Sequence, residues 1–488
     1  MALIQGILDI VRIWNNLWWM NILMAIVVII LGRNKNPRST LMWLMVLVFL
    51  PVVGFLLYLF LGQDYTKRKM FMLKEEQDRF ITEVSLFQRD FISEGKFFYN
   101  NEKSQSYYDL IKMNLKLDES FYTQDNEISM FYWGRDKFYS LIKDLENANR
   151  SIDMQYYIFE DDTLGKRIIR VLERKAKEGL KVRLLYDGVG SRRLRKKTFE
   201  RLIENGGQVA VFFPSIFPIF NVKLNYRNHR KIVVIDDEIG YVGGFNVSDD
   251  YLGLRKKFGP WRDTHARIVG SGVLGLKFRF LKDWQYAHGD KKDPVEPIVG
   301  SYNPNGHSGV QIVTSGPDTQ FENVKNAYFK MITSAKEAIY IQTPYFVPDE
   351  TIMDALKTAI ISGIDVHIMI PRMPDHPFVY WATTSYAGEL IKLGAKVYKY
   401  EKGFLHCKVL IVDDYIASVG SANMDIRSFA LNFEVISIIY DEEINRDLRG
   451  QYRRDIENSL AYTEQLYRER GLIIKAKEAF SRLLSPIL

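Results

Sequence analysis

The hydrophobic and polar residues of this chain begin with two apolar stretches, at 17–32 and 40–62, and the second carries no charged residue. A helix that crosses a bilayer needs roughly 20 apolar residues, so we expect a two-helix transmembrane hairpin joined by the basic loop 33–39. A cleaved signal peptide is the alternative for the first stretch. The residues after Gly32 lack the small-residue cleavage pattern that a signal peptide would require.

Residues 66–126 are charged, with phenylalanines interspersed. We expect a mostly helical connector whose apolar face either lies along a membrane surface or packs against the rest of the protein.

From residue 127 onward the pattern alternates between helix and strand, and the alternation occurs twice. The first round predicts helices at 136–149 and 164–178 and strands at 151–159 and 181–186. The second predicts helices at 321–336 and 350–362 and strands at 338–342 and 365–370. The fold class is therefore α/β with two repeats. We expect a hairpin over 1–65, a connector over 66–126, and repeats over 127–295 and 296–488, with the Gly- and Pro-rich linker 290–307 between the repeats and a helical tail from 446.

One short pattern recurs within these repeats at a constant offset. The first copy reads His229-x-Lys231-x4-Asp236-x6-Gly243-Gly244-x-Asn246, and the second reads His406-x-Lys408-x4-Asp413-x6-Gly420-Ser421-x-Asn423. The offset is 406 − 229 = 177, and the lysines, acids and asparagines give the same difference. A single His-x-Lys strand is common, but two matching copies in one chain indicate a shared site.

Composition narrows the class of partner. The chain is 47% hydrophobic, which favours sizeable cores, and its net charge of +7 suits an anionic partner. Its one cysteine, Cys407, excludes an intrachain disulfide and a cysteine-built metal site. We expect Cys407 to be structural, because on a strand it points away from the flanking His406 and Lys408.

Strand geometry predicts which motif residues share a face. Residues two apart lie side by side on a strand, so His229 and Lys231 share one face. Asp236 follows His229 by an odd number of positions, so we expect it, like Asp413, to point to the opposite face and to hold the fold. Another acid then orients each imidazole, and the downstream candidates are Asp263 and Glu434.

If the repeats pair about a pseudo-twofold axis, two histidines, two lysines and two asparagines meet. Such a cluster suits a phosphoryl group: lysines and asparagines hold its oxygens, one neutral histidine attacks phosphorus, and the other, protonated, serves the leaving alkoxide. We expect no metal and no cofactor, because the lysines supply the positive charge. The remaining histidines show no metal-ligand spacing; they are His265, His288, His307, His367 and His376.

The paired motif, the stretch from Trp261 to His265, the apolar N-terminus and the ending at 482–488 together resemble bacterial cardiolipin synthases of the phospholipase D superfamily. The resemblance covers nearly the whole chain. It implies transfer of a phosphatidyl group between two phosphatidylglycerol molecules through a phosphohistidine, with release of glycerol. It favours His229 as the nucleophile but leaves the choice open. It places the catalytic positions at His229, Lys231, Asp236, His406, Lys408 and Asp413, and we expect Asn246, Asn423 and Ser421 to bind the substrate phosphate.

The expected partners are phosphatidylglycerol and anionic membrane lipid, not nucleic acid; a homo-oligomer is left open. We expect a cell-membrane protein with two N-terminal spans. The charges flanking the spans pull both ways, and a cytoplasmic catalytic unit is favoured. The basic stretches 192–197 and 255–257 either contact lipid headgroups or form a solvated surface. The apolar run 211–220 either contacts lipid or forms a buried strand and turn.

Four functions compete: the synthase, a phospholipase D that uses water as acceptor, a nuclease, and a non-catalytic lipid binder. Water and lipid acceptors differ only in how the pocket excludes water, so the sequence separates the first two poorly. The apolar N-terminus argues against the nuclease, and two complete motifs argue against a mere binder.

Overall fold

The computed structural model describes residues 18–30, 37–50, 53–55, 58, 79–214, 226–255, 258–288 and 301–485. The chain forms two compact units, 1–73 and 74–488. The larger unit carries both copies of the histidine motif.

The smaller unit contains a helix over residues 18–30 and helix α2 (Pro37–Phe49). Met24, Val28, Leu47 and Tyr58 form its buried core, and the Tyr58 hydroxyl donates to the carbonyl oxygen of Val28 at 3.4 Å. Within the part of the chain that the structure describes, no helix is long and apolar enough to span a bilayer. The expected spans, 17–32 and 40–62, lie partly outside the described residues.

The expected connector forms α5 (Arg79–Ser93), α6 (Glu102–Gln105) and α7 (Tyr108–Asp118). Leu110, Ile111 and Leu115 of α7 are buried in the same core as strands of the second repeat. The side chain of Gln88 exchanges two hydrogen bonds of 2.7 Å with the backbone of Tyr122. Of the two interpretations offered for the connector, these contacts match packing against the rest of the protein.

Among its described residues, the first repeat forms a sheet in the strand order β1-β8-β7-β6-β2-β3-β4, in which β2, β3 and β4 run parallel. Its elements are β1 (Thr123–Trp133), α8 (Gly134–Glu146), β2 (Ser151–Tyr156), α9 (Thr163–Lys177), β3 (Lys181–Asp187), α10 (Glu200–Glu204), β4 (Gln208–Phe212), β5 (Arg227–Asn228), β6 (Ile232–Ile235), β7 (Ile239–Gly243), β8 (Trp261–Val269) and α11 (Val273–His288).

The second repeat has the same strand order, β9-β18-β16-β15-β10-β12-β13, extended by β19. Its elements are β9 (Ser308–Ser315), α12 (Asn323–Ser334), β10 (Ala338–Gln342), β11 (Phe346–Val347), α13 (Glu350–Ile361), β12 (Asp365–Pro371), α14 (Pro377–Ile391), β13 (Lys396–Tyr400), β14 (Phe404–Leu405), β15 (Val409–Val412), β16 (Ile416–Gly420), β17 (Met424–Asp425), α15 (Ile426–Ala430), β18 (Asn432–Tyr440), α16 (Glu442–Ile456), β19 (Ser459–Ala461), α17 (Glu464–Arg468) and α18 (Leu472–Leu483).

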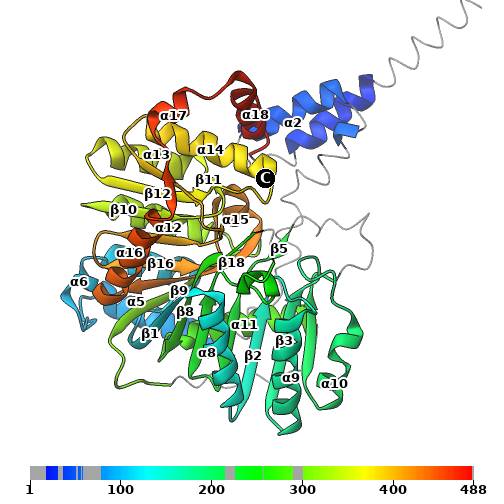
Figure 1. Cartoon of the computed structure of the whole chain (residues 1–488), viewed down its shortest axis with the longest axis vertical. Helices are drawn as coiled ribbons and strands as arrows, with labels where there is room; N and C mark the ends of the chain where they lie inside the picture. The colour runs from blue at the N-terminus through cyan, green and yellow to red at the C-terminus, as the bar shows by residue number, and fades with distance from the viewer. Residues whose placement is uncertain are drawn as a thin grey trace, which may run out of the picture. The chain divides into compact units, whose positions relative to one another are not determined.

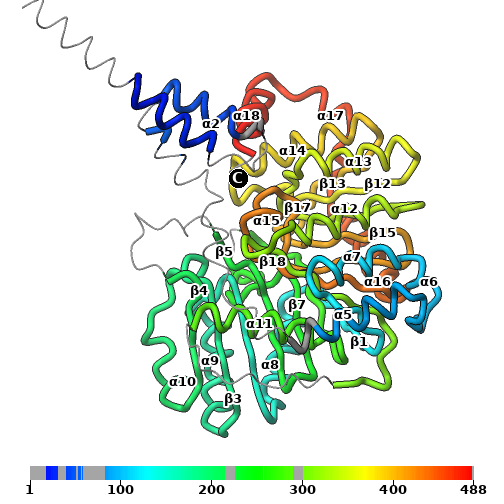
Figure 2. The backbone as a smooth tube through the Cα atoms, turned by 180° about the vertical axis from the view of Figure 1, so that it is seen from behind, coloured from blue at the N-terminus to red at the C-terminus, as the bar shows by residue number. Residues whose placement is uncertain are grey.

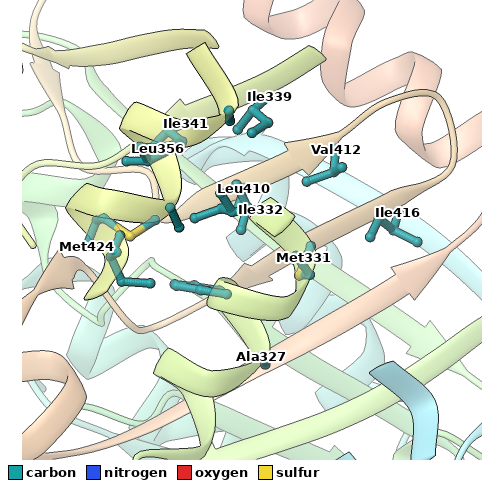
Figure 3. Close-up of a cluster of buried hydrophobic side chains, with 14 of the residues drawn as sticks. Ala327, Met331, Ile332, Ile339, Ile341, Leu356, Leu410, Val412, Ile416 and Met424 are labelled. Carbon is teal, nitrogen blue, oxygen red and sulfur yellow. The ribbon is translucent and has the colours of Figure 1, made fainter. Parts of the chain in front are cut away.

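Figures 1 and 2 show the two repeats end to end, with β5 and β18 where they meet. β1 joins the two sheets, because it pairs antiparallel with both β8 and β9. Helices of the second repeat cover its sheet with apolar side chains: Ile332 of α12 and Leu356 of α13 lie against Ile341 and Leu410 (Figure 3). The continuous apolar runs of β6 and β15 are buried along their whole length, as a sheet covered on both faces requires.

Two buried arginines bind across the junction of the repeats. Arg230 pairs with Asp283 of α11 at 2.7 Å, and its guanidinium donates to the carbonyl oxygens of Glu434 and Ser315 in the other repeat. Arg262 of β8 pairs with Asp455 of α16 in the second repeat at 2.8 Å. Each acid also accepts from a glutamine at an equivalent strand position, Gln155 for Asp283 and Gln342 for Asp455.

The structure differs from the sequence expectations at several elements. The tail from 446 is not wholly helical, because β19 interrupts it and pairs with β13 at the sheet edge. β1 crosses the boundary expected at 126/127, and α14 had not been predicted. Of the apolar run 211–220, Phe212 and Phe213 are buried against Tyr286 and Phe433, while 215–220 lie outside the described residues.

Candidate active site

Two very short strands fix the histidines at the junction of the repeats. β5 ends directly before His229 and pairs with the start of β18 in the other repeat. β14 ends directly before His406 and pairs with the start of β8. The backbone N–H of His229 donates to the carbonyl oxygen of Phe433 at 2.9 Å, and that of His406 donates to Arg262 at 2.7 Å. Each histidine is therefore positioned by the repeat to which it does not belong.

The acids that contact the imidazoles also come from the opposite repeat. Nδ1 of His406 lies 2.6 Å from Oδ2 of Asp263, and Nδ1 of His229 lies 3.1 Å from Oε1 of Glu434. Both carboxylates are fully buried, whereas the histidine side chains are 15% and 19% exposed. The two acids named from the sequence therefore lie beside the histidines, in a crossed arrangement that the sequence had not indicated.

These contacts fix the tautomer of each ring. A carboxylate only accepts, so each Nδ1 carries its hydrogen and each neutral ring keeps the Nε2 lone pair. Burial lowers the pKa of His229 to about 4, although Glu434 raises it. Burial, assisted by Lys408, lowers the pKa of His406 to about 4 against the opposing effect of Asp263. Both imidazoles are therefore neutral at pH 7 before an anion binds.

The two lysines lie close enough to influence each other. Burial lowers the pKa of Lys231 to about 7, with Lys408 adding to the effect and Glu434 opposing it. Burial likewise lowers the pKa of Lys408. Each ammonium group donates to the carbonyl oxygen of its neighbouring histidine; the distance from Lys231 Nζ to the His229 oxygen is 2.5 Å. A bound anion would raise both lysine pKa values, because its charge favours the protonated amines.

Asp236 and Asp413 lie at the far ends of β6 and β15 from the histidines. The Asp236 carboxylate accepts from the backbone N–H groups of residues 149–151, and Asp413 accepts from those of residues 336–338. Both adopt a left-handed backbone, with φ of 54° and 51°. The geometry matches the fold-holding position that strand parity predicts, because both carboxylates lie at the hairpin turns. The catalytic part that the resemblance gives these two acids stays a prediction.

The expected phosphate-binding residues differ in their surroundings. The Asn246 side chain accepts from the Ile158 N–H and donates to the Tyr251 hydroxyl at 2.6 Å. The side-chain oxygen of Asn423 is buried without a hydrogen-bond partner among the described residues. The Ser421 hydroxyl is buried and donates to Oε2 of Glu434 at 2.5 Å, so it supports that acid instead of facing an open position.

The Gly244/Ser421 difference follows from the two acids. A Cβ at Gly244 would lie 1.9 Å from Oδ1 of Asp263, so the shorter acid occupies the space that a side chain would need. At the equivalent position in the other repeat, Ser421 fits beside the longer Glu434. The two half-sites are therefore built from an Asp–Gly pair and a Glu–Ser pair.

Sequence reasoning missed two neighbours of His229. The Tyr157 ring lies 4.1 Å from the imidazole, centroid to centroid. The Asn432 amide donates to Oε1 of Glu434 at 3.2 Å, beside His229 Nδ1. Tyr157 directly follows β2, and Asn432 begins β18 two residues before Glu434, so their positions at strand ends were the available signal.

The fold and site define a class: two-repeat α/β proteins in which two His-x-Lys segments, each lying between two short strands, meet at the junction of the repeats. The family model described as "Cardiolipin synthase, PLD-like domain" matches residues 141–257 and 328–456, and "Phospholipase_D-nuclease N-terminal" matches 20–63. Cardiolipin synthase of Listeria welshimeri is 47% identical over 96% of this chain and 97% of its own length. The major cardiolipin synthase of Bacillus subtilis is 49% identical with the same coverage.

The chain therefore belongs to the cardiolipin synthase family of phospholipase D-like proteins. Among solved structures, phosphatidylserine synthase of Haemophilus influenzae superposes with a TM-score of 0.60 at 16% identity, covering 80% of this chain and all of that one. At that identity the similarity concerns the fold alone.

Proposed function

We propose that this protein is a cardiolipin synthase that joins two phosphatidylglycerol molecules and releases glycerol through a phosphohistidine intermediate. One observation carries the chemistry: two neutral imidazoles, each held at Nδ1 by a buried carboxylate of the other repeat, meet two buried lysines at one junction. The close relatives named as cardiolipin synthases support the choice of substrate.

In the first step, Nε2 of one histidine attacks the phosphorus of phosphatidylglycerol and the bond from phosphorus to the glycerol oxygen breaks. The other histidine, which becomes an imidazolium when the charge of the bound phosphate raises its pKa, gives its proton to that oxygen, and glycerol leaves. In the second step, the now neutral histidine takes the proton from a hydroxyl of a second phosphatidylglycerol, whose oxygen attacks phosphorus and frees the first histidine. Lys231 and Lys408 hold the non-bridging oxygens and balance their charge throughout.

We assign the nucleophile to His229 and the acid–base role to His406. Asp263 lies closer to its histidine, at 2.6 Å, than Glu434 does, at 3.1 Å. Glu434 also accepts from Asn432 and Ser421, which spreads its charge over more donors. The carboxylate with the closer contact stabilises an imidazolium better, which favours His406 as the proton carrier.

The assignment predicts where the covalent intermediate forms. The protein is mixed with phosphatidylglycerol that carries a radioactive label on its phosphorus, and the reaction is quenched in alkali, in which phosphohistidine survives. The label should then be found on the peptide that contains His229. Label on the His406 peptide would exchange the two roles. Turnover without label on either histidine would contradict the covalent route.

The function itself is tested with purified full-length protein and labelled phosphatidylglycerol in mixed micelles. Cardiolipin and glycerol should appear in equal amounts, and His229→Ala should abolish both. Phosphatidic acid as the main product would instead indicate the hydrolytic phospholipase D, and cleavage of DNA without lipid turnover would indicate a nuclease.

Gly244→Ala and Ser421→Ala form a matched pair for the crossed acids. The added methyl at 244 would displace the Asp263 carboxylate, so we expect kcat to fall by about 100-fold, a typical contribution of acid–base catalysis. Ser421→Ala removes one hydrogen bond to Glu434 without a clash, and a loss of roughly 10-fold or less is expected. Equal losses in the two variants would contradict this account of the asymmetry.

We further propose a membrane-bound protein with two N-terminal spans, a catalytic unit on the cytoplasmic side, and repeats divided as 127–295 and 296–488. The charge-free stretch 40–62 supports the anchor. Resistance of the protein to alkaline extraction from membranes, combined with protease access only from the cytoplasmic side, is the expected result.

A further inference from the structure

Helix α18 (Leu472–Leu483) exposes large apolar side chains and buries polar ones, which is the reverse of an ordinary surface helix. Four of its exposed side chains are large and apolar: Leu472 is 84% exposed, Ile473 74%, Leu483 79% and Phe480 55%. Its buried side chains are polar, with Glu478 at 4% and Ser481 at 1%. A helix that packs on a soluble protein normally buries the apolar stripe and exposes the polar one, so this arrangement needs a separate explanation.

Polar contacts hold α18 in this orientation. The Glu478 carboxylate pairs with Arg470 at 2.7 Å and accepts from the Thr384 hydroxyl of α14 at 3.1 Å. Arg482 pairs with Glu389 of α14 at 2.9 Å. Rotating the helix to bury its leucines would break the buried ion pair and expose Glu478. These polar contacts therefore keep the apolar side of α18 facing outward.

The apolar surface continues onto α14. The Phe378 ring, 51% exposed, lies 6.3 Å from the Phe480 ring. We call the exposed set of Leu472, Ile473, Phe480, Leu483 and Phe378 the outer face.

Two exposed lysines, Lys475 and Lys477, border the outer face. At 3.6 residues per turn they lie on opposite sides of the apolar stripe of α18. Lys477 also lies over the ring of Trp381, 5.3 Å from its centroid. The outer face is therefore an apolar stripe with a cation along each border.

The helix α14, which carries part of the outer face, is linked to the candidate active site through two short strands. The N–H of Phe346 in β11 donates to Thr383 of α14 at 3.1 Å. β11 pairs in turn with β17, which directly follows Asn423. Tyr345 donates to Asp375, two residues before α14 begins. Two contacts, α14 with β11 and β11 with β17, therefore connect the helix that carries Phe378 to the residues that follow Asn423.

We propose that the outer face docks on the surface of an anionic bilayer. Its leucine, isoleucine and phenylalanine side chains enter the boundary between headgroups and acyl chains, and Lys475 and Lys477 contact lipid phosphates. A second copy packed face to face would bring the same lysines together, whereas an anionic headgroup layer complements them. The inference extends the proposed function, whose substrate is a bilayer lipid, but its test does not depend on the reaction.

Single-cysteine labelling tests the docking in the full-length protein. Cys407 is fully buried and burial raises its pKa to about 12, so it does not compete for a thiol-reactive fluorophore. Ile473→Cys and Phe480→Cys are labelled and placed in nanodiscs that contain phosphatidylglycerol and lipids with a nitroxide on the acyl chain. Ile203→Cys on α10 is the matched control, because Ile203 is exposed to the same 55% as Phe480.

We expect nitroxide lipids to quench positions 473 and 480 several-fold more strongly than position 203, and aqueous iodide to quench only 203. Iodide quenching at 473 and 480 equal to that at 203 would show an outer face open to water and overturn the docking. Protection from both quenchers would show that protein covers the face, either residues 1–73 or a second copy, and would equally overturn it.

Nanodiscs of zwitterionic phosphatidylcholine should reduce the nitroxide quenching several-fold. Unchanged quenching in these nanodiscs would contradict the proposed contact of Lys475 and Lys477 with anionic headgroups. Quenching by lipid without formation of cardiolipin would refute the proposed function while leaving the docking in place. Formation of cardiolipin without such quenching would refute the docking while leaving the proposed function in place.

Discussion

Lys231 shows how a single residue of the site trades stability for chemistry. Burial lowers its pKa to about 7, so near neutral pH the folded protein holds a charge that its surroundings disfavour. The unfolded chain binds the same proton up to the ordinary lysine pKa of 10.5. Between these values the unfolded state holds more protons, so the stability of the protein rises with pH across this window.

Lys231→Met should therefore raise the free energy of unfolding while abolishing activity. We expect a gain of about 2 kcal/mol at pH 7, less than the full pKa shift implies because the buried site relaxes. The gain should shrink as the pH rises towards 10. Denaturant unfolding at several pH values measures it, with the surface variant Lys357→Met as a control expected within roughly 0.5 kcal/mol of the parent. A Lys231→Met variant less stable than the parent at every pH would refute this interpretation.

The two buried acids distinguish the roles of the histidines. Asp263 raises the pKa of His406 and Glu434 raises that of His229, in each case against the larger effect of burial. Asp263→Asn should lower the pKa of the proton-carrying histidine, moving the basic limb of the kcat–pH profile to lower pH and reducing kcat by about 100-fold. Glu434→Gln should instead move the acidic limb to lower pH, because that limb reports deprotonation of the nucleophile. The opposite pairing of limbs and variants would assign His406 as the nucleophile.

At the scale of elements, the histidine hairpins are held at their turns by aspartates in left-handed conformation. Asp236 satisfies three backbone donors at the start of β2. Asp236→Ala should destabilise the protein by about 2–4 kcal/mol, because buried N–H groups lose their acceptor and alanine disfavours positive φ. Asp236→Asn should cost less, since asparagine tolerates this backbone and still accepts. The kcat of the folded fraction should stay within a few-fold of the parent; a 100-fold fall at unchanged stability would indicate a direct catalytic part.

Local pattern predicted most of these elements. The strands at 338–342 and 365–370 agree closely with β10 and β12, because unbroken apolar runs and flanking helices mark buried parallel strands. Strand parity indicated correctly that Asp236 and Asp413 point away from the histidines. The short edge strand β19 was missed, because three residues within a helical pattern carry too little signal.

The crossed pairing of Asp263 with His406 and of Glu434 with His229 could not be predicted from the sequence. Both acids lie downstream of a histidine in their own repeat, and only the docking of the repeats decides which one each acid reaches. The same docking sets the environment that lowers the lysine pKa values. The sequence thus predicted which residues form the site, but it did not predict which acid contacts which histidine.

At the scale of the whole molecule, the buried pair of Arg262 and Asp455 ties the first repeat to the second. Arg262→Met should cost about 3–5 kcal/mol, because it leaves Asp455 charged and buried. The double variant Arg262→Met/Asp455→Leu should recover a large part of that loss. Denaturation of both single variants and the double variant gives the coupling energy, and Lys396→Met, which breaks an exposed pair with Asp365, should cost less than about 1 kcal/mol. Strictly additive losses would contradict a pair that acts as a unit.

The crossing of the acids also sets when the site can first exist. Glu434 is synthesised 434 − 229 = 205 residues after His229. At roughly 5–20 residues per second, the first motif waits about 10–40 s for its carboxylate and for the strand that fixes its backbone. A growing chain attached to the ribosome therefore holds a complete His-x-Lys motif that cannot act. Phosphoryl transfer begins only once the second repeat has emerged and folded against the first. Folding of the second repeat is therefore the step that makes the enzyme active.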